Sequence, residues 1–150
     1  MADVEEKEEL IVYRSSMRMP YRWAAGMTAT KFYREIAENQ KLYATYCPIC
    51  KRNLFPARKS CSRCFTETSE WVEVASLGTI ETFTIAHHQK KEGIAAIYAL
   101  IKLDGADTAF IHKISTLTAE KVKIGARVRA VFAEKATGNI LDIKHFELID

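Results

Sequence analysis

All four cysteines of the chain lie in one short stretch, as two Cys-x-x-Cys pairs separated by ten residues. The first pair is Cys47 and Cys50, and the second is Cys61 and Cys64. Each pair can form a tight turn that aims two sulfur atoms at one point, and two such turns facing each other complete a tetrahedral metal site. The spacing therefore predicts a four-cysteine metal site that holds the surrounding segment together.

The residues beside the cysteines favour zinc over iron. Rubredoxin-type iron sites use the same four sulfurs, but they usually have a longer loop and a glycine after the second cysteine of each pair. Lys51 and Phe65 occupy those two positions here. Four cysteine ligands also leave no open coordination position, so we expect one structural zinc ion rather than a catalytic one. A redox dithiol is disfavoured because no βαβ pattern surrounds the pairs.

Composition and the amino terminus agree with a metal site rather than disulfides. The chain of 150 residues is 48% hydrophobic and 27% charged, which is ordinary for a globular protein. No apolar run approaches the roughly 18 residues of a membrane helix. The first ten residues, MADVEEKEEL, are acidic, whereas a secretory signal is basic and then apolar. We therefore expect a cytoplasmic protein, in a compartment where paired cysteines are mostly reduced.

Basic side chains crowd the cysteine segment and have two interpretations. They could offset the charge of about −2 on a zinc tetrathiolate, or they could hold the phosphates of a nucleotide or of CoA. A zinc tetrathiolate would also lower the formal net charge of +3 to about +1, which disfavours a nucleic-acid-binding role. The residues concerned are Lys51, Arg52, Arg58, Lys59 and Arg63.

The segment before the cysteines is predicted to be mainly helical. In TATKFYREIAENQKL, Phe32 and Ile36 lie four residues apart on one apolar stripe. We expect Thr28 or Thr30 to cap this helix and Asn39 to end it. Upstream, MPYRWAAG is expected to form a short helix or a turn, and the acidic first nine residues are expected to fray.

From Trp71 onward the pattern changes to β. WVEVASLGTIETFTIAHH predicts a short strand, a turn at Gly78 and a longer strand, and IAAIYALIKL predicts a strand buried on both faces. TAFIHKI, RVRAVFAE and ILDIKHFELID complete about five strands, with STLTAEKVKIG as a short helical insert before the fourth. That count and insert match an OB-fold barrel, and an SH3-like barrel or a sandwich would give a similar pattern.

The predicted fold class is mainly β with N-terminal helices, in which a zinc ribbon is followed by a five-stranded OB-fold barrel. We divide the chain into an N-terminal helical segment (1–46), the zinc ribbon (47–70) and the barrel (71–150).

The sequence does not assemble a catalytic constellation. No cysteine remains outside the metal site to act as an acyl nucleophile, and no Gly-x-Ser-x-Gly elbow, phosphate loop or dinucleotide fingerprint is present. We therefore predict that the chain is not an enzyme. The histidines are expected to be surface residues or hydrogen-bonded strand residues: His87, His88, His112 and His145.

The order of these segments resembles a known family. The stretches KFYREIAENQKLYATYCPICKRNLFPARKSCSRC, WVEVASLGTIETFT and KIGARVRAVF resemble the family named "domain of unknown function 35", acyl-CoA-associated OB-fold proteins with a rubredoxin-like zinc ribbon. The resemblance covers about residues 20–148. Ala57 stands where the family often has a second proline, and Lys51 and Phe65 stand where it often has glycine.

The resemblance implies a non-catalytic scaffold for enzymes of the thiolase superfamily. It implies a thiolase as partner, with hydroxymethylglutaryl-CoA synthase as a second candidate, and acyl-CoA passing between their active sites. A CoA thioester needs a basic patch and an apolar groove, so we expect it at the loop KRNLFPARK, with Arg58 and Lys59 on the phosphates and Phe55 and Pro56 as the groove wall. The alternative for Phe55 and Pro56 is simple packing of the ribbon on the barrel.

Two further predictions concern binding surfaces. The rival function is a module that binds single-stranded nucleic acid through aromatic side chains on the barrel, for which the candidates are Phe83, Tyr98 and Phe110. The partner contact is predicted in the N-terminal region, and self-association through the same surface stays open. The candidate contact residues are Tyr21, Trp23, Phe32 and Tyr33.

Overall fold

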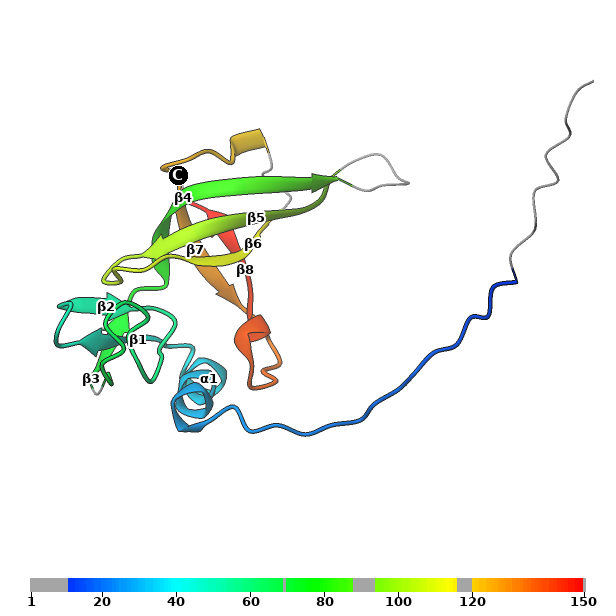
Figure 1. The fold of residues 1–150 in the computed structure, drawn as a ribbon. Helices are drawn as coiled ribbons and strands as arrows, with labels where there is room; N and C mark the ends of the chain where they lie inside the picture. The colour runs from blue at the N-terminus through cyan, green and yellow to red at the C-terminus, as the bar shows by residue number, and fades with distance from the viewer. Residues whose placement is uncertain (1–10, 69, 88–93, 116–119, 150) are drawn as a thin grey trace, which may run out of the picture.

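The computed structural model describes residues 11–68, 70–87, 94–115 and 120–149. Within these residues, one α-helix lies beside a small sheet, and a barrel follows (Figure 1). The helix is α1 (Met27–Asn39), and the small sheet contains β1 (Leu42–Cys47), β2 (Arg52–Leu54) and β3 (Glu70–Val74). The barrel strands are β4 (Leu77–His87), β5 (Ile94–Leu103), β6 (Phe110–Ile114), β7 (Arg127–Phe132) and β8 (Ile143–Leu148), with a 3-10 turn, η2 (Ile140–Asp142), before β8.

The barrel is closed, in the order β4-β5-β6-β8-β7. Neighbouring strands are antiparallel, except that β6 and β8 run parallel where the barrel closes. Five strands closed in a Greek-key order form the OB architecture. The closed barrel excludes the β-sandwich, which the strand pattern of the sequence also allowed. The prediction of a mainly β chain with a five-stranded OB-type barrel is confirmed. The predicted helical insert covers residues 115–125, of which 116–119 lie outside the described residues, and Glu120 and Lys121 form a short 3-10 turn.

The prediction of a turn at Gly78 is wrong. The strand structure is interrupted at Ala75 and Ser76, between β3 and β4, and Gly78 is already the second residue of β4. A Cβ atom at position 78 would lie 2.6 Å from the carbonyl oxygen of Lys102 on β5. Glycine is therefore needed there because two strands approach closely, and not because the chain reverses.

The helical prediction for the N-terminal segment holds only over Met27–Asn39. The helix ends at Asn39 as expected, and Gln40 follows in the left-handed conformation (φ 53°), with its N–H donated to the carbonyl of Ile36. The N-cap is Gly26 and not Thr28 or Thr30. No helix forms in residues 11–26, so the short helix or turn expected there is also absent.

The stretch after the helix is a strand and not a continuation of the helix. In LYATYC, Leu42 and Ala44 face the core while Tyr43 is half-buried, which is the alternation of a strand. This strand, β1, lies between β2 and β3 in a three-stranded antiparallel sheet. Trp71 and Val72 pair with β1, so the sheet that carries the cysteines extends past residue 70. The division into three segments stays a prediction.

One continuous core joins the helix, the small sheet and the barrel. Phe55, just after β2, lies with its ring centroid 5.7 Å from that of Phe32 on α1 and 4.7 Å from that of Phe110 on β6. Phe110 in turn contacts Phe146 on β8. A single aromatic side chain from the cysteine-bearing segment thus bridges the helix and the barrel.

Hydrogen bonds fasten β2 to the loop between β5 and β6. The N–H of Asn53 donates to the carboxylate of Asp107 at 2.8 Å, and the N–H of Asp107 donates to the carbonyl of Asn53 at 2.8 Å. The guanidinium of Arg52 donates to the carbonyl of Asp107 at 2.7 Å. The hydroxyl of Thr108 donates to the carbonyl of Phe55 and accepts from its N–H. The cysteine-bearing sheet is therefore held against the barrel by hydrogen bonds from β2 and Phe55 to this one loop.

Asp142 organises the turn before β8. Its side chain is almost fully buried and accepts hydrogen bonds from the backbone and hydroxyl of Thr137 and from the N–H groups of Gly138 and Asn139. Burial by itself would raise the pKa of Asp142, but these donors together hold it below its ordinary value. The ionised carboxylate is therefore the form that the folded chain prefers.

We expect Asp142→Asn to lower the free energy of unfolding by about 2 kcal/mol at pH 7. The NH₂ group of asparagine would replace one accepting oxygen, so that its donors would face the N–H donors of the turn. The folded-state pKa lies below the unfolded one, so the stabilisation is complete above the unfolded pKa and disappears as the pH falls through the folded pKa. Urea unfolding should show the difference shrinking in acid. Glu134→Gln, at an exposed carboxylate, is the control. An equal loss at both positions would contradict this role.

Among the described residues, no helix is both long and apolar enough to cross a membrane.

Candidate metal centre

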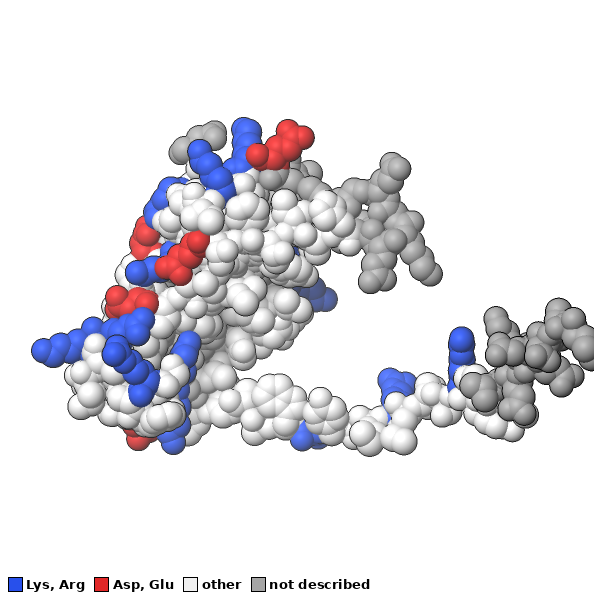
Figure 2. Space-filling view, turned by 45° about the horizontal axis from the view of Figure 1, so that its top comes forward, with Lys and Arg blue, Asp and Glu red and all other residues white. Residues whose placement is uncertain are grey.

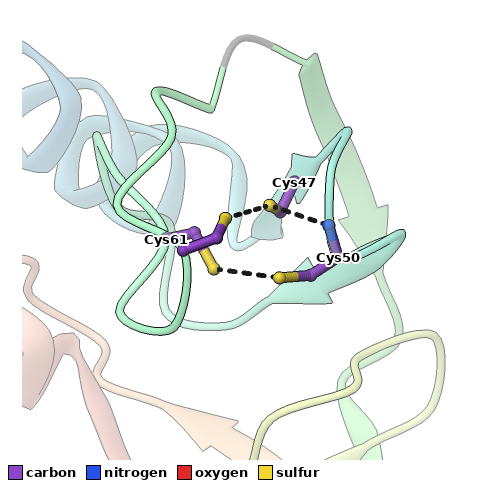
Figure 3. A group of neighbouring side chains, drawn as sticks. Cys47, Cys50 and Cys61 are labelled. Carbon is purple, nitrogen blue, oxygen red and sulfur yellow. Dashed lines mark hydrogen bonds between the residues drawn. The ribbon is translucent and has the colours of Figure 1, made fainter.

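The four cysteines converge as predicted. Their sulfur atoms all lie within 4.8 Å of one another. The sulfurs of Cys47 and Cys64 are 3.4 Å apart. Those of Cys50 and Cys61 are 3.8 Å apart (Figure 3). A tetrahedral zinc ion with bonds of about 2.3 Å to sulfur would separate its ligands by about 3.8 Å. The cluster could therefore hold a metal ion such as zinc with little rearrangement.

Backbone amides support the sulfur atoms in both turns. The N–H of Cys50 donates to the sulfur of Cys47 at 3.4 Å, and the N–H of Arg63 donates to the sulfur of Cys61 at 3.4 Å. Cys47 comes from the end of β1, and Cys61 lies in the loop that follows β2. Amide donors of this kind orient thiolates and partly offset their charge. Because all four positions around the centre are sulfur, the arrangement suits a structural ion.

Hydrogen bonds give the thiols of Cys50, Cys61 and Cys64 different pKa values. The hydroxyl and the backbone of Thr66 lower the pKa of Cys64 to about 6, and amide donors lower that of Cys61. Hydrogen bonding to Cys64, together with burial, raises the pKa of Cys50 to about 12. Thiolate is the metal-binding form of cysteine, so metal binding would remove the proton that Cys50 otherwise keeps.

Lys51 and Phe65 adopt the left-handed conformation, with φ values of 52° and 60°. These residues directly follow the second cysteine of each pair, where glycine is usual. The turn geometry is therefore retained without glycine, at a conformational cost of about 1–2 kcal/mol for each residue. The side chain of Phe65 is 82% exposed, so packing does not compensate for that cost.

We expect Phe65→Gly to raise the free energy of unfolding by about 0.5–1 kcal/mol. Glycine relieves the left-handed backbone, and the gain is reduced by the greater freedom of the unfolded chain. Ser62→Gly, in the same turn but without a positive φ, should lower stability by about 0.5–1 kcal/mol. Chemical unfolding of the zinc-loaded proteins measures both changes. A loss of stability in both variants would contradict the proposed cause.

The basic side chains around the cysteines divide into two groups. Three are engaged within the chain: Arg52 with the loop at Asp107, Arg58 with the carbonyls of Phe55 and Pro56, and Lys59 with Glu67 at 3.8 Å. In the part of the chain that the structure describes, the side chains of Lys51 and Arg63 form no ion pair or hydrogen bond. Blue side chains gather at the end of the molecule that carries the cysteines (Figure 2).

The predicted CoA-contacting residues do not form one open groove. Phe55 is fully buried, so the prediction that it forms a groove wall is wrong, and the alternative of core packing holds for it. Pro56 and Arg58 are half-buried beside it, and Lys59 is exposed. A CoA site in this loop thus depends on Pro56, Arg58 and Lys59, and it stays a prediction.

Comparisons with known proteins agree with this architecture. A family profile described as the C-terminal OB-fold domain of ChsH2 matches residues 71–133. A protein of unknown function from the DUF35 family of Sulfolobus solfataricus is 19% identical, with a TM-score of 0.59 over 80% of this chain and 83% of that one. The barrel of this chain is therefore similar to those of OB-fold proteins of the DUF35 family. The resemblance read from the sequence is confirmed.

A second similar structure is described as an Ltp2-ChsH2(DUF35) aldolase. It is 22% identical, with a TM-score of 0.57, and the alignment covers 85% of this chain and 97% of that one. No curated protein matches. At these identities, the two solved structures show the fold that this chain shares with them.

The aromatic face expected for nucleic-acid binding is incomplete in this barrel. Tyr98 is exposed and Phe83 is half-buried, but Phe110 lies in the core. Bases stack on exposed rings, so Phe110 is excluded as a stacking platform. The described face offers one freely accessible ring instead of a row of three.

His112 departs from the prediction that the histidines are exposed or fully hydrogen-bonded. It is buried between Phe110 and Phe146, and its Nδ1 has no hydrogen-bond partner among the described residues. Burial lowers the pKa of His112. His87 is exposed and His145 is half-buried, whereas His88 lies outside the described residues. The alternation of FIHKI, with Phe110, His112 and Ile114 facing inward, could have revealed this burial.

Proposed function

We propose that this chain is a non-catalytic, zinc-containing accessory protein of an enzyme that acts on acyl-CoA thioesters. The observation that carries the proposal is the segment 11–26, which we call the arm. The arm leaves the folded body as an extended chain (Figure 1), and its large apolar side chains are exposed. Seven of them are exposed: Ile11, Val12, Tyr13, Met17, Met19, Tyr21 and Trp23.

An uncovered apolar segment of this size is costly for an isolated chain in water and usually marks an interaction site. Tyr21 and Trp23 fit the predicted partner contact, because both are more than 70% exposed. Phe32 does not, because its side chain is buried beneath α1, so that part of the prediction is wrong. Tyr33 is half-buried against the core. The partner contact therefore moves from the helix to the arm before it.

The similar solved structure supports a partner enzyme, because its description pairs a ChsH2(DUF35) chain with Ltp2 in an aldolase. For this chain we propose an enzyme of the thiolase superfamily, with hydroxymethylglutaryl-CoA synthase as a second candidate. The partner would supply the reacting groups. The DUF35-type chain would add a rigid platform and basic side chains for the phosphates of CoA, namely Arg58 and Lys59 beside the half-buried Pro56.

Zinc, in this proposal, replaces core packing at the end of the small sheet that carries the cysteines. Leu42, Ala44 and Val74 of that sheet belong to the main core, whereas the cluster around Cys47 and Cys61 contains only Leu54 as a further buried member among the described residues. A segment with so little buried apolar surface usually requires a metal ion or disulfides. Cytoplasmic location, where thiols stay reduced, belongs to the same proposal.

Affinity purification of the tagged chain from its native cell tests the function. We expect an enzyme of acyl-CoA metabolism to co-purify in near-equal amounts, and to be absent when residues 11–26 are deleted. The deletion should leave the zinc content unchanged, because the arm contacts none of the cysteines. Recovery of the intact chain with nucleic acid, or alone, would contradict the proposal.

A further inference from the structure

The arm has a regular pattern along its second half. From Met17 to Trp23 the sequence is MRMPYRW, in which every second residue is large and apolar. The residues between them are Arg18, Pro20 and Arg22. In an extended chain, successive side chains point to opposite sides, so this pattern gives one apolar edge and one basic edge.

The structure leaves the apolar edge open. Met17, Met19, Tyr21 and Trp23 are 84%, 72%, 79% and 74% exposed. Their side chains therefore remain available to a partner. Figure 2 shows the arm as largely white with separate blue side chains along it, apart from the body of the molecule.

A helix formed by the arm would not place these apolar side chains on one face. At 3.6 residues per turn, Met17 and Met19 would lie on nearly opposite faces of a helix. Pro20 would also remove one hydrogen bond and clash with the preceding turn. Proline is compatible with an extended chain and restricts the freedom that binding must remove. The sequence thus fits an extended bound form.

The connection to the body is well defined. Gly26 has a φ of 81° and caps α1, so the chain turns sharply where the arm meets the helix. Phe32 and Ile36 then anchor α1 in the core. The arm is therefore tethered to a rigid body, and a partner held by the arm would lie close to the platform that α1 and the barrel form.

We propose that residues 17–23 bind the partner enzyme as an extended strand. The apolar edge would fill an apolar groove on the partner, and Arg18 and Arg22 would pair with acidic side chains on its rim. The arm carries three arginines and no acidic residue, so charge complementarity selects an acidic rim. This inference rests on the proposed function, because the occupant is the enzyme that co-purifies with the chain.

Insertions in the arm test the extended form directly. One alanine inserted between Met19 and Pro20 moves Tyr21 and Trp23 to the opposite edge, whereas two alanines restore their side. We expect the single insertion to weaken binding of the co-purifying enzyme about 100-fold, as the loss of two aromatic contacts would. The double insertion should recover most of that loss. Titration calorimetry with the purified enzyme measures both variants.

The basic edge of the arm is tested by a separate variant. Arg18→Glu with Arg22→Glu should weaken binding about 10-fold or more and should reduce its salt dependence. Lys135→Glu, at an exposed barrel position, is the matched control and should change little. All variants should keep the unfolding midpoint of the intact chain, because the altered positions are exposed.

The outcomes separate the two proposals. If no acyl-CoA enzyme associates with the intact chain, the proposed function fails and the inference fails with it. The enzyme could associate with the intact chain while the single and the double insertion weaken binding equally, or while neither insertion weakens binding. Either result overturns extended docking and leaves the accessory function standing. Recovery with two alanines but not with one supports the strand.

Discussion

Cys61→Ser is expected to abolish stoichiometric metal binding and to unfold the cysteine-bearing sheet. Cys61 is almost fully buried, and its sulfur receives the N–H of Arg63 in the centre of the cluster. Structural zinc contributes about 10–16 kcal/mol of apparent binding free energy in small zinc-finger peptides, and that binding energy is also folding energy. Elemental analysis should fall from about one equivalent of zinc to near zero, and amide exchange should become fast in β1 and β2.

Ser62→Ala, at the neighbouring position that supplies no sulfur, controls for disturbance of the turn. It should keep a full equivalent of zinc and the wild-type exchange pattern. A chelator should reproduce the Cys61→Ser phenotype in the unmodified chain. Less than about half an equivalent of zinc in the unmodified chain, with iron in its place and visible absorbance, would contradict the assignment of the ion.

Phe55→Ala should have the largest effect among the apolar core positions. Phe55 is fully buried and touches aromatic rings from α1 and β6, so its removal opens a cavity where the helix, the small sheet and the barrel meet. Such truncations cost about 3–5 kcal/mol. We expect a loss of that size in urea unfolding, together with a single cooperative transition, because the core is continuous.

Phe65→Ala is the matched control, since it removes the same atoms from an exposed phenylalanine in the same segment. It should change the free energy of unfolding by less than about 0.5 kcal/mol. Equal effects at positions 55 and 65, or two separate transitions in the unmodified chain, would contradict a shared core.

The features that the sequence predicted correctly depend on local patterns. The cysteine spacing predicted the converging sulfurs, because each turn is set by four consecutive residues. The strands at IAAIYALIKL and RVRAVF followed from runs of apolar and β-branched residues, which are local as well. Asn39 ended the helix as expected. These are the cases in which neighbours in sequence determine the outcome.

The wrong predictions depend on contacts between distant residues. LYATYC is a strand because it pairs with residues on both β2 and β3, and the sequence around it does not reveal those partners. Gly78 resembled a turn signal, but the close approach of Lys102 from β5 explains it. Phe55 lay in a basic loop that suggested a ligand site, and its burial depends on Phe32 and Phe110.

The predicted partner contact in the N-terminal region was limited in the same way, because it depends on which side chains the fold buries. Aromatic residues there indicated a contact surface, with Tyr21 and Trp23 expected in a short helix or turn and Phe32 and Tyr33 expected on the helix that follows. The structure buries Phe32 and leaves Tyr21 and Trp23 on an extended arm. The alternation in MRMPYRW could have indicated this, because a period of two is incompatible with a helical stripe.

Acyl-CoA turnover is the most direct test of the accessory role. The assay compares the purified chain, the co-purifying enzyme and the two recombined at equal concentration. We expect no turnover by the chain alone, and turnover by the recombined pair at least about 10-fold above that of the enzyme alone. Turnover by the partner-free chain, lost on substitution of a single side chain, would contradict the account, as would an enzyme that is equally active without the chain.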